Sequence, residues 1–225
     1  MGVRSTRQIG GILRDAAVFD FKNTPGALVN ADSLLTSVDK LFALLEERRI
    51  DYVLVGGVAL LTYVKGRNTQ DIDLILSPRW LAQLPEIEIS SQDEYFARGR
   101  FGELQVDLLL TRNPLFETVR QQHVTVKQFV ERKVRCATVE GLLLLKLYAL
   151  PSLYRQGSFA EVGIYENDIA TLLHDYRPSL DPLFADLARH LSEADMRELR
   201  QIVGEIEARI ERFRKGADTT TRTPS

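Results

Sequence analysis

The stretch that decides the fold is "YVLVGGVALLTYVKGRNTQDIDLIL", residues 52–76. It begins with a short apolar strand, passes through Gly56-Gly57 into a short apolar helix, and ends in a second strand, "DIDLIL". Successive side chains of a strand point to opposite faces, so Asp71 and Asp73 share one face, with Cα atoms ~6.6 Å apart. The stretch therefore predicts a strand, turn, helix and strand with two neighbouring carboxylates on one strand face.

A third carboxylate lies further along the chain. The segment "EYFARGRFGELQVDLLL", residues 94–110, has the pattern of a β-hairpin that turns near Gly102. In its second strand Val106 and Leu108 share one face, which leaves Asp107 on the other. If this strand neighbours "DIDLIL" in a sheet, the three acids converge.

Two carboxylates side by side on a partly buried surface repel each other unless positive charge lies between them. Magnesium prefers hard oxygen ligands, commonly one or two carboxylates completed by water and substrate phosphates. The pattern therefore predicts a magnesium site at Asp71, Asp73 and Asp107. The alternative is a strand end at which water solvates the acids.

The glycine pair between the first strand and the helix allows two interpretations. Glycine lets backbone amides approach a phosphate closely, and a helix N-terminus adds partial positive charge. Alternatively, Gly56 and Gly57 only make a tight turn, and both interpretations can hold together. The chain contains neither the P-loop lysine pattern nor G-x-G-x-x-G, so those two classes of nucleotide site are not supported.

A second constellation pairs a lysine with an acid. The segment "EGLLLLKLYAL", residues 140–150, is apolar around most of its helical circumference, and Lys146 is the outlier. In the next expected helix Asp168 falls on the inward stripe, where a buried acid normally needs a partner. Lys146 could extend to water, pair with Asp168 as a structural clamp, or act with it in the functional site.

The layout is α+β. We expect an N-terminal extension over residues 1–30, an α/β core over 31–125, a mostly helical domain over 126–215 and a disordered tail over 216–225. In the helical part, helices are expected over 139–150, 163–176, 181–191 and 192–215.

Two features refine the helical part. Ser192 and Asp195 form a capping box at the start of the last helix. Pro151 is expected to end the helix of residues 139–150. The long connection after it, which contains Tyr154 and Arg155, is a candidate for a segment that closes over substrate.

The composition of the chain excludes several classes of protein. With 44% hydrophobic and 27% charged residues in 225, the chain has the composition of an ordinary soluble globular protein. Its single cysteine, Cys136, excludes an intramolecular disulfide and fits a reducing compartment, and no apolar run is long enough to span a bilayer. The three histidines and Cys136 show no zinc-ligand spacing. We expect a cytoplasmic protein with no membrane partner.

The formal net charge of −2 supplies no chain-wide positive field for nucleic acid. Residues 96–136 are locally basic, with four acids and a net charge of +4, which allows a basic surface or merely scattered solvated charge. The eight basic residues are Arg98, Arg100, Arg112, Arg120, Lys127, Arg132, Lys133 and Arg135.

The strand, Gly-Gly turn and short helix, followed by "GRNTQDIDL" and a later strand aspartate, resemble the nucleotidyltransferase superfamily that includes DNA polymerase beta. More narrowly, residues 52–76 resemble the AbiEii-type nucleotidyltransferase toxins of bacterial type IV toxin–antitoxin systems. The resemblance implies a polymerase beta-like fold, a small mixed sheet with flanking helices, followed by a helical region.

The resemblance also implies roles for the acids and glycines. Gly56 and Gly57 would contact the triphosphate of an NTP, and Asp71 and Asp73 would hold two magnesium ions. Asp107 would complete the metal site or help to deprotonate the attacking hydroxyl.

The resemblance implies further roles for three basic residues and for Asp168. Lys146 would bind nucleotide phosphates, and Asp168 would help to position acceptor or nucleotide. Lys65 and Arg67, in the loop before Asp71, are further candidates for the triphosphate.

We therefore expect a magnesium-dependent transfer of a nucleotide from an NTP to a hydroxyl. For a toxin-like member the acceptor would be RNA, most plausibly the 3′ end of tRNA, with a cognate antitoxin as partner. The alternatives are modification of a small molecule such as an antibiotic, modification of a protein side chain, and a catalytically silent binding protein with the same fold.

Overall fold

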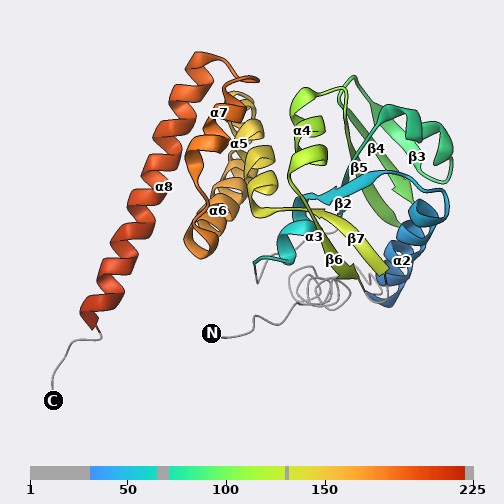
Figure 1. Cartoon of the computed structure of the whole chain (residues 1–225), viewed down its shortest axis with the longest axis horizontal. Helices are drawn as coiled ribbons and strands as arrows, with labels where there is room; N and C mark the ends of the chain where they lie inside the picture. The colour runs from blue at the N-terminus through green and yellow to red at the C-terminus, as the bar shows by residue number, and fades with distance from the viewer. Residues whose placement is uncertain (1–30, 65–70, 130–131, 221–225) are drawn as a thin grey trace. The chain divides into compact units, whose positions relative to one another are not determined.

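The structure is a computed structural model that describes residues 31–64, 71–129 and 132–220 (Figure 1). The expected N-terminal extension, Lys65, Arg67 and the last five residues of the expected tail lie outside the described residues. The chain divides into two compact units, Met1–Leu142 and Leu143–Ser225.

The first unit is built around a seven-stranded mixed sheet of order β3-β4-β5-β2-β1-β7-β6 (Figure 1). The pairs β1–β7 and β2–β5 are parallel, and the other neighbours are antiparallel. The strands are β1 (Tyr52–Val55), β2 (Asp71–Leu76), β3 (Glu88–Gln92), β4 (Phe96–Phe101), β5 (Leu104–Leu110), β6 (Val124–Phe129) and β7 (Arg132–Ala137).

Helices pack against this sheet. Helix α2 (Ala31–Glu47) contacts β5, and its buried positions recur at helical spacing: Val38, Leu41, Phe42 and Leu45. Helix α3 (Gly56–Leu61) lies between β1 and β2 in sequence and is almost wholly buried. A 3-10 helix, η1, covers Pro78–Gln83, and helix α4 (Pro114–Gln122) contacts β2, β5 and β6.

Helix α4, which was not among the helices expected from the sequence, begins with a side-chain cap. The Asn113 side chain accepts a hydrogen bond of 2.9 Å from the backbone N–H of Leu115, and Pro114 occupies the first helical turn. The mixed sheet with its flanking helices confirms the predicted α+β class.

The first unit extends further than the expected core of residues 31–125. Strands β6 and β7 belong to the sheet, because β7 pairs in parallel with β1 through Leu54 and Cys136. The division between the units consequently falls after Leu142. A parallel pairing between two strands so far apart in sequence leaves no local signal.

The second unit is helical. It contains most of α5 (Val139–Arg155), then α6 (Phe159–Tyr176), α7 (Leu180–Leu187) and α8 (Glu193–Thr220). Its buried side chains include Leu147, Leu172, Phe184, Leu199 and Val203.

Four helix boundaries differ from the expectation by four residues or more, and one of them is the end of α7, which was expected at residue 191 and lies at Leu187. The prediction that Pro151 ends α5 was wrong, because the helix continues through it to Arg155. Pro151 is itself buried next to Leu150, so packing outweighs the lost backbone hydrogen bond. Helix α6 begins at Phe159 rather than at residue 163, and α8 reaches Thr220, past the expected start of disorder.

The predicted cap of α8 is present. The Ser192 hydroxyl accepts a hydrogen bond of 3.1 Å from the backbone N–H of Asp195 and donates one of 2.8 Å to the Asp195 carboxylate. This arrangement satisfies a backbone donor that the first turn would otherwise leave without a partner.

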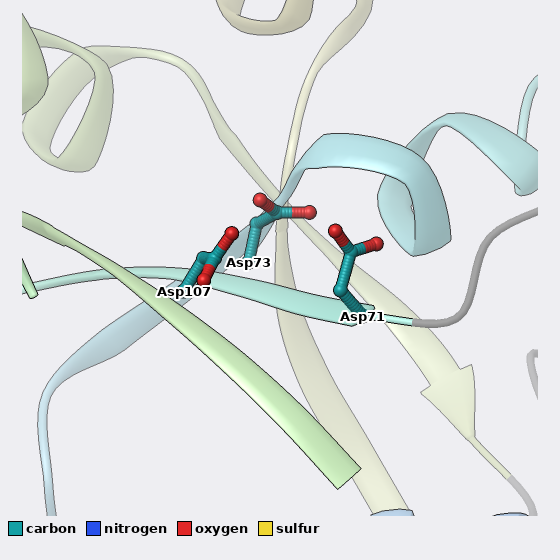
Figure 2. A group of neighbouring side chains, drawn as sticks. All are labelled: Asp71, Asp73 and Asp107. Atoms are coloured by element: carbon teal, nitrogen blue, oxygen red, sulfur yellow. The ribbon is translucent and has the colours of Figure 1, made fainter. Parts of the chain in front are cut away.

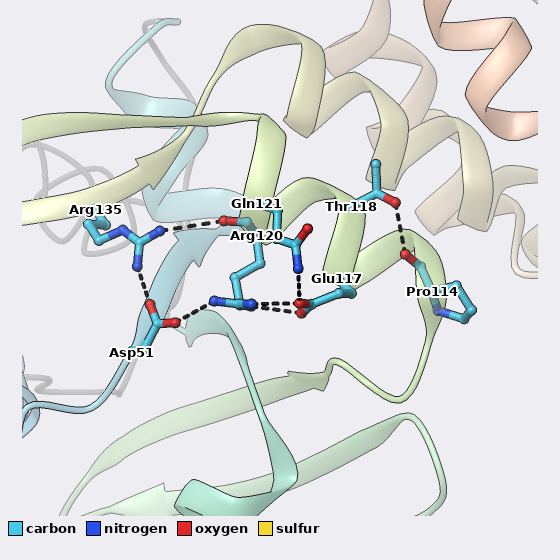
Figure 3. Close-up of polar contacts among 7 residues, drawn as sticks. All are labelled: Asp51, Pro114, Glu117, Thr118, Arg120, Gln121 and Arg135. Atoms are coloured by element: carbon cyan, nitrogen blue, oxygen red, sulfur yellow. Dashed lines mark hydrogen bonds and ion pairs between the residues drawn. The ribbon is translucent and has the colours of Figure 1, made fainter.

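A cluster of ion pairs links β7, α4 and the entry to β1 (Figure 3). The Asp51 carboxylate accepts from both Arg120 and Arg135, and Arg120 also donates to Glu117 at 2.7 Å through Nε. These contacts join the residue before β1 to α4 and to β7.

Candidate active site

The three acids converge as the strand pattern predicts (Figure 2). In the parallel pair β2–β5, Asp73 lies directly opposite Asp107, and Asp71 lies two residues before Asp73 on the same face. One carboxylate oxygen from each of the three lies within 4.8 Å of the others, and all three side chains are partly buried. The intervening Ile72, like Leu74, points into the core and is fully buried.

The glycine turn is built against one of these acids. Val55, the last residue of β1, pairs with Asp73, and Gly56 follows with a φ of +61°. A Cβ atom on Gly56 would lie 1.8 Å from Oδ2 of Asp73, and the backbone N–H of Gly57 donates to that same oxygen at 3.4 Å. The turn therefore makes room for the Asp73 carboxylate and holds it.

Replacing Gly56 with Ala should lower the free energy of unfolding by more than the cost of placing alanine at a positive φ. The new methyl group would collide with Asp73, and alanine is strained at this φ, so we expect an unfolding free energy lower by about 2–4 kcal/mol. Urea denaturation of the full chain measures this loss.

The matched control is Gly102→Ala, because Gly102 has a φ of +59° but a Cβ atom added there would meet nothing within 4 Å. It reports the cost of the backbone conformation without the collision. Equal losses for the two variants would contradict the proposed contact between Gly56 and Asp73.

Arg98 is a further member of the site, and the sequence pattern did not single it out. It lies on β4 opposite Asp107, and its Nε and one terminal nitrogen donate to Oδ1 and Oδ2 of Asp107 at 2.7 and 2.8 Å. The hydrogen bond to Asp107 and the charge of that carboxylate raise the pKa of the Arg98 guanidinium, and Asp71 and Asp73 add to the effect. Counting outward from the predicted turn at Gly102 pairs residue 98 with residue 107, so the hairpin pattern in the sequence already indicates that Arg98 lies opposite Asp107.

Lys146 and Asp168 form a buried ion pair in the second unit. The distance from Lys146 Nζ to Asp168 Oδ2 is 2.7 Å, and the two residues are only 5% and 3% exposed. The Lys146 ammonium also lies 4.2 Å from the centre of the Tyr165 ring, a cation–π contact. The alternative in which Lys146 extends to water is therefore wrong, whereas the pair with Asp168, on which the other two alternatives depend, is present.

Tyr154 and Arg155 do not belong to an open connection. Both lie on α5, where the Tyr154 hydroxyl donates to Glu166 and Arg155 pairs with Asp195. Only residues 156–158 separate α5 from α6, so the prediction of a long segment that closes over substrate was wrong.

Much of the local positive charge of residues 96–136 is matched by acidic side chains of the same unit. Five of its eight basic residues form ion pairs with acids of the same unit: Arg98, Arg100, Arg120, Arg132 and Arg135. Lys127 lies over the Tyr63 ring at 4.5 Å. Cations that are already paired release fewer counterions on binding a polyanion, so this segment is a poor electrostatic footprint for nucleic acid.

Cys136 is not a candidate nucleophile. The residue is fully buried, and burial raises the pKa of its thiol to about 12. None of the helices in the described part of the chain has the length and apolar character needed to cross a membrane.

No protein-family model and no curated protein matches the chain. Among solved structures, it resembles an antigenic nucleotidyltransferase-like protein from Paracoccidioides brasiliensis, with 21% identity, a TM-score of 0.46, and coverage of 76% of this chain and 93% of the other.

It also resembles the antibiotic-resistance factor ANT(2'')-Ia. The solution structure of that protein gives 15% identity, a TM-score of 0.45, and coverage of 84% of this chain and 100% of the other. Its crystal structure in complex with adenylyl-2"-tobramycin gives 14% identity, a TM-score of 0.46, and coverage of 77% and 97%.

Proposed function

We propose that this protein is a divalent-cation-dependent nucleotidyltransferase, which moves a nucleotide from an NTP to an acceptor hydroxyl. The observation that carries the proposal is the convergence of Asp71, Asp73 and Asp107 beside the Gly56-Gly57 turn. Three acids gathered on one sheet face repel one another, and that cost is offset when they hold a cation.

The residues present fit magnesium. Carboxylate oxygens are the hard ligands that this ion selects, and a partly exposed site leaves positions for water and substrate phosphates. When bound, magnesium supplies positive charge to the triphosphate and to the attacking and leaving oxygens. Asp71 and Asp73 would hold it from one strand, and Asp107 would complete the ligand set from the neighbouring strand.

The reaction itself is an in-line displacement. The acceptor oxygen forms a bond to the α-phosphorus, the bond between that phosphorus and the oxygen bridging to the β-phosphate breaks, and pyrophosphate leaves. The hydroxyl proton needs an acceptor, and Asp107 is the carboxylate that we assign to it if it does not serve only as a ligand. Gly56 and Gly57 would lie beside the triphosphate.

The acceptor is a separate question. RNA, with the 3′ end of tRNA as target and an antitoxin as partner, is the acceptor that the sequence resemblance implies. The ion pairs that occupy five arginines of the basic segment favour a second candidate, a small hydroxyl-bearing molecule. A small acceptor does not require an extended cationic surface.

The direct test measures pyrophosphate release from each of the four NTPs in the presence of Mg2+. Parallel reactions contain total RNA, a panel of hydroxylated small molecules including aminoglycosides, or a bacterial protein extract, and α-labelled NTP shows which acceptor gains the nucleotide. Label on RNA supports the first candidate, and label on a small molecule supports the second. The proposal would be contradicted if no NTP released pyrophosphate with any acceptor and calorimetry showed no binding of Mn2+. That result would favour a catalytically silent binding protein.

A further inference from the structure

The ion pair between Arg98 and Asp107 places a cation of the protein's own chain at the metal site. Across four adjacent strands the paired residues form one row: Arg98 on β4, Asp107 on β5, Asp73 on β2 and Val55 on β1. The guanidinium at the end of this row covers both carboxylate oxygens of Asp107. Asp107 is thus engaged by Arg98 in the same region where it would meet a metal ion.

The electrostatics of the cluster give this contact a role. Three carboxylates with oxygens within 4.8 Å of one another destabilise the folded site when no cation neutralises them. A planar guanidinium that binds a carboxylate at two points offsets part of that repulsion and fixes the orientation of the acid. Arg98 therefore keeps Asp107 in place without a metal ion.

The contact is also easy to release. The Arg98 side chain is 60% exposed, whereas that of Asp107 is 17% exposed, so the guanidinium can move into water without disturbing the core. Ion pairs with one well-solvated partner contribute little stability. A divalent cation, which interacts with several carboxylates at once, competes for the same oxygens on favourable terms.

We propose that Arg98 is a built-in counter-ion that competes with the divalent cation for Asp107 and thereby sets the affinity of the site for metal. This inference rests on the proposed function, because it assumes that the acids hold a metal ion. Arg98 is on this account a positioning residue, and it leaves Asp107 when the metal binds.

The test is a titration of the full chain with Mn2+, without NTP or acceptor. Binding is measured by isothermal calorimetry and by the electron paramagnetic resonance signal of free Mn2+. Arg98→Gln removes the competing charge and should tighten Mn2+ binding by up to about fivefold, the change expected for loss of a partly exposed ion pair. Arg98→Lys keeps the charge but loses the two-point contact, so its affinity should fall between those of Arg98→Gln and the wild type.

The matched control is Arg100→Gln. Arg100 lies two residues further along β4, is 59% exposed, and pairs with Glu103 at 3.3 Å rather than with an acid of the site. It therefore reports the general effect of one lost positive charge. Unfolding in urea checks that each variant is folded.

The outcomes separate this inference from the proposed function. Tighter Mn2+ binding by Arg98→Gln than by Arg100→Gln supports the competition. If the wild type binds Mn2+ but Arg98→Gln binds it equally or more weakly than Arg100→Gln, the competition is wrong and the metal site stands. If neither the wild type nor any variant binds Mn2+, both the metal site and the role of Arg98 are contradicted.

Discussion

Replacing Asp73 with Asn is expected to lower the rate of nucleotide transfer by about a thousandfold or more. Asp73 lies between the other two acids in the site, because it shares a strand face with Asp71 and pairs across strands with Asp107. Asparagine has nearly the same shape and can still accept the hydrogen bond from Gly57, but it lacks the negative charge that a divalent cation requires. Loss of one main electrostatic group in an active site typically costs on the order of 10²–10³ in rate, and loss of a metal ligand should cost at least as much.

Initial rates of pyrophosphate release at saturating NTP and Mg2+ measure this effect. The control is Glu103→Gln, which also removes one negative charge but from a residue whose side chain is 89% exposed and paired with Arg100. This control should keep the wild-type rate. A folded Asp73→Asn variant that transfers nucleotide as fast as the wild type would remove Asp73 from the reaction.

Replacing Lys146 with Met is expected to lower the free energy of unfolding by about 3–5 kcal/mol, the usual cost of leaving one partner of a buried ion pair without its counter-charge. Asp168 would keep its charge in a position where it is only 3% exposed, and the contact with Tyr165 would be lost as well. Urea denaturation of the full chain measures the loss. The control is Arg189→Met, because the Arg189 side chain is 64% exposed in its pair with Asp186 and should cost less than about 1 kcal/mol.

A double variant, Lys146→Met with Asp168→Leu, distinguishes a clamp from a functional pair. Replacing both buried charges with apolar side chains of similar size is often nearly neutral, so the double variant should regain most of the lost stability. Wild-type transfer by the stable double variant would show that the pair is only structural. Inactivity of an equally stable double variant would assign the pair to the reaction, as the sequence resemblance implies. A Lys146→Met variant no less stable than Arg189→Met would contradict the stability argument.

The sequence predicted the shared face of Asp71 and Asp73 because strand alternation is a local rule, whereas the parallel pairing of β2 with β5 that brings Asp107 to them is not local. The positions of Asp71, Asp73 and Asp107 in apolar strands fix their faces, and the turn at Gly102 fixes the β4–β5 register. The same register also pairs Arg98 with Asp107, but in the sequence this arginine is one of several basic residues that look equally exposed. Its place opposite Asp107 in the hairpin distinguishes it from the other basic residues.

Other features depend on tertiary structure and could not be predicted locally. The pairing of β7 with β1 joins segments separated by most of the first unit. Continuation of α5 through Pro151 reflects packing that overrides a strong local preference. The burial of Lys146 was predicted only as an alternative, because an apolar helix does not reveal what covers it.

The central claim, that Asp71, Asp73 and Asp107 form one divalent-cation site, is tested most directly by crystals grown with Mn2+ and a non-hydrolysable NTP analogue. Anomalous difference density collected at the manganese edge locates the ion without any assumption about its ligands. We expect a manganese peak in coordination contact with the carboxylates of Asp71 and Asp73 and with Asp107 or a water that it binds, next to the analogue's phosphates. A peak elsewhere in the molecule, or an ordered analogue with no manganese between these acids, would contradict it.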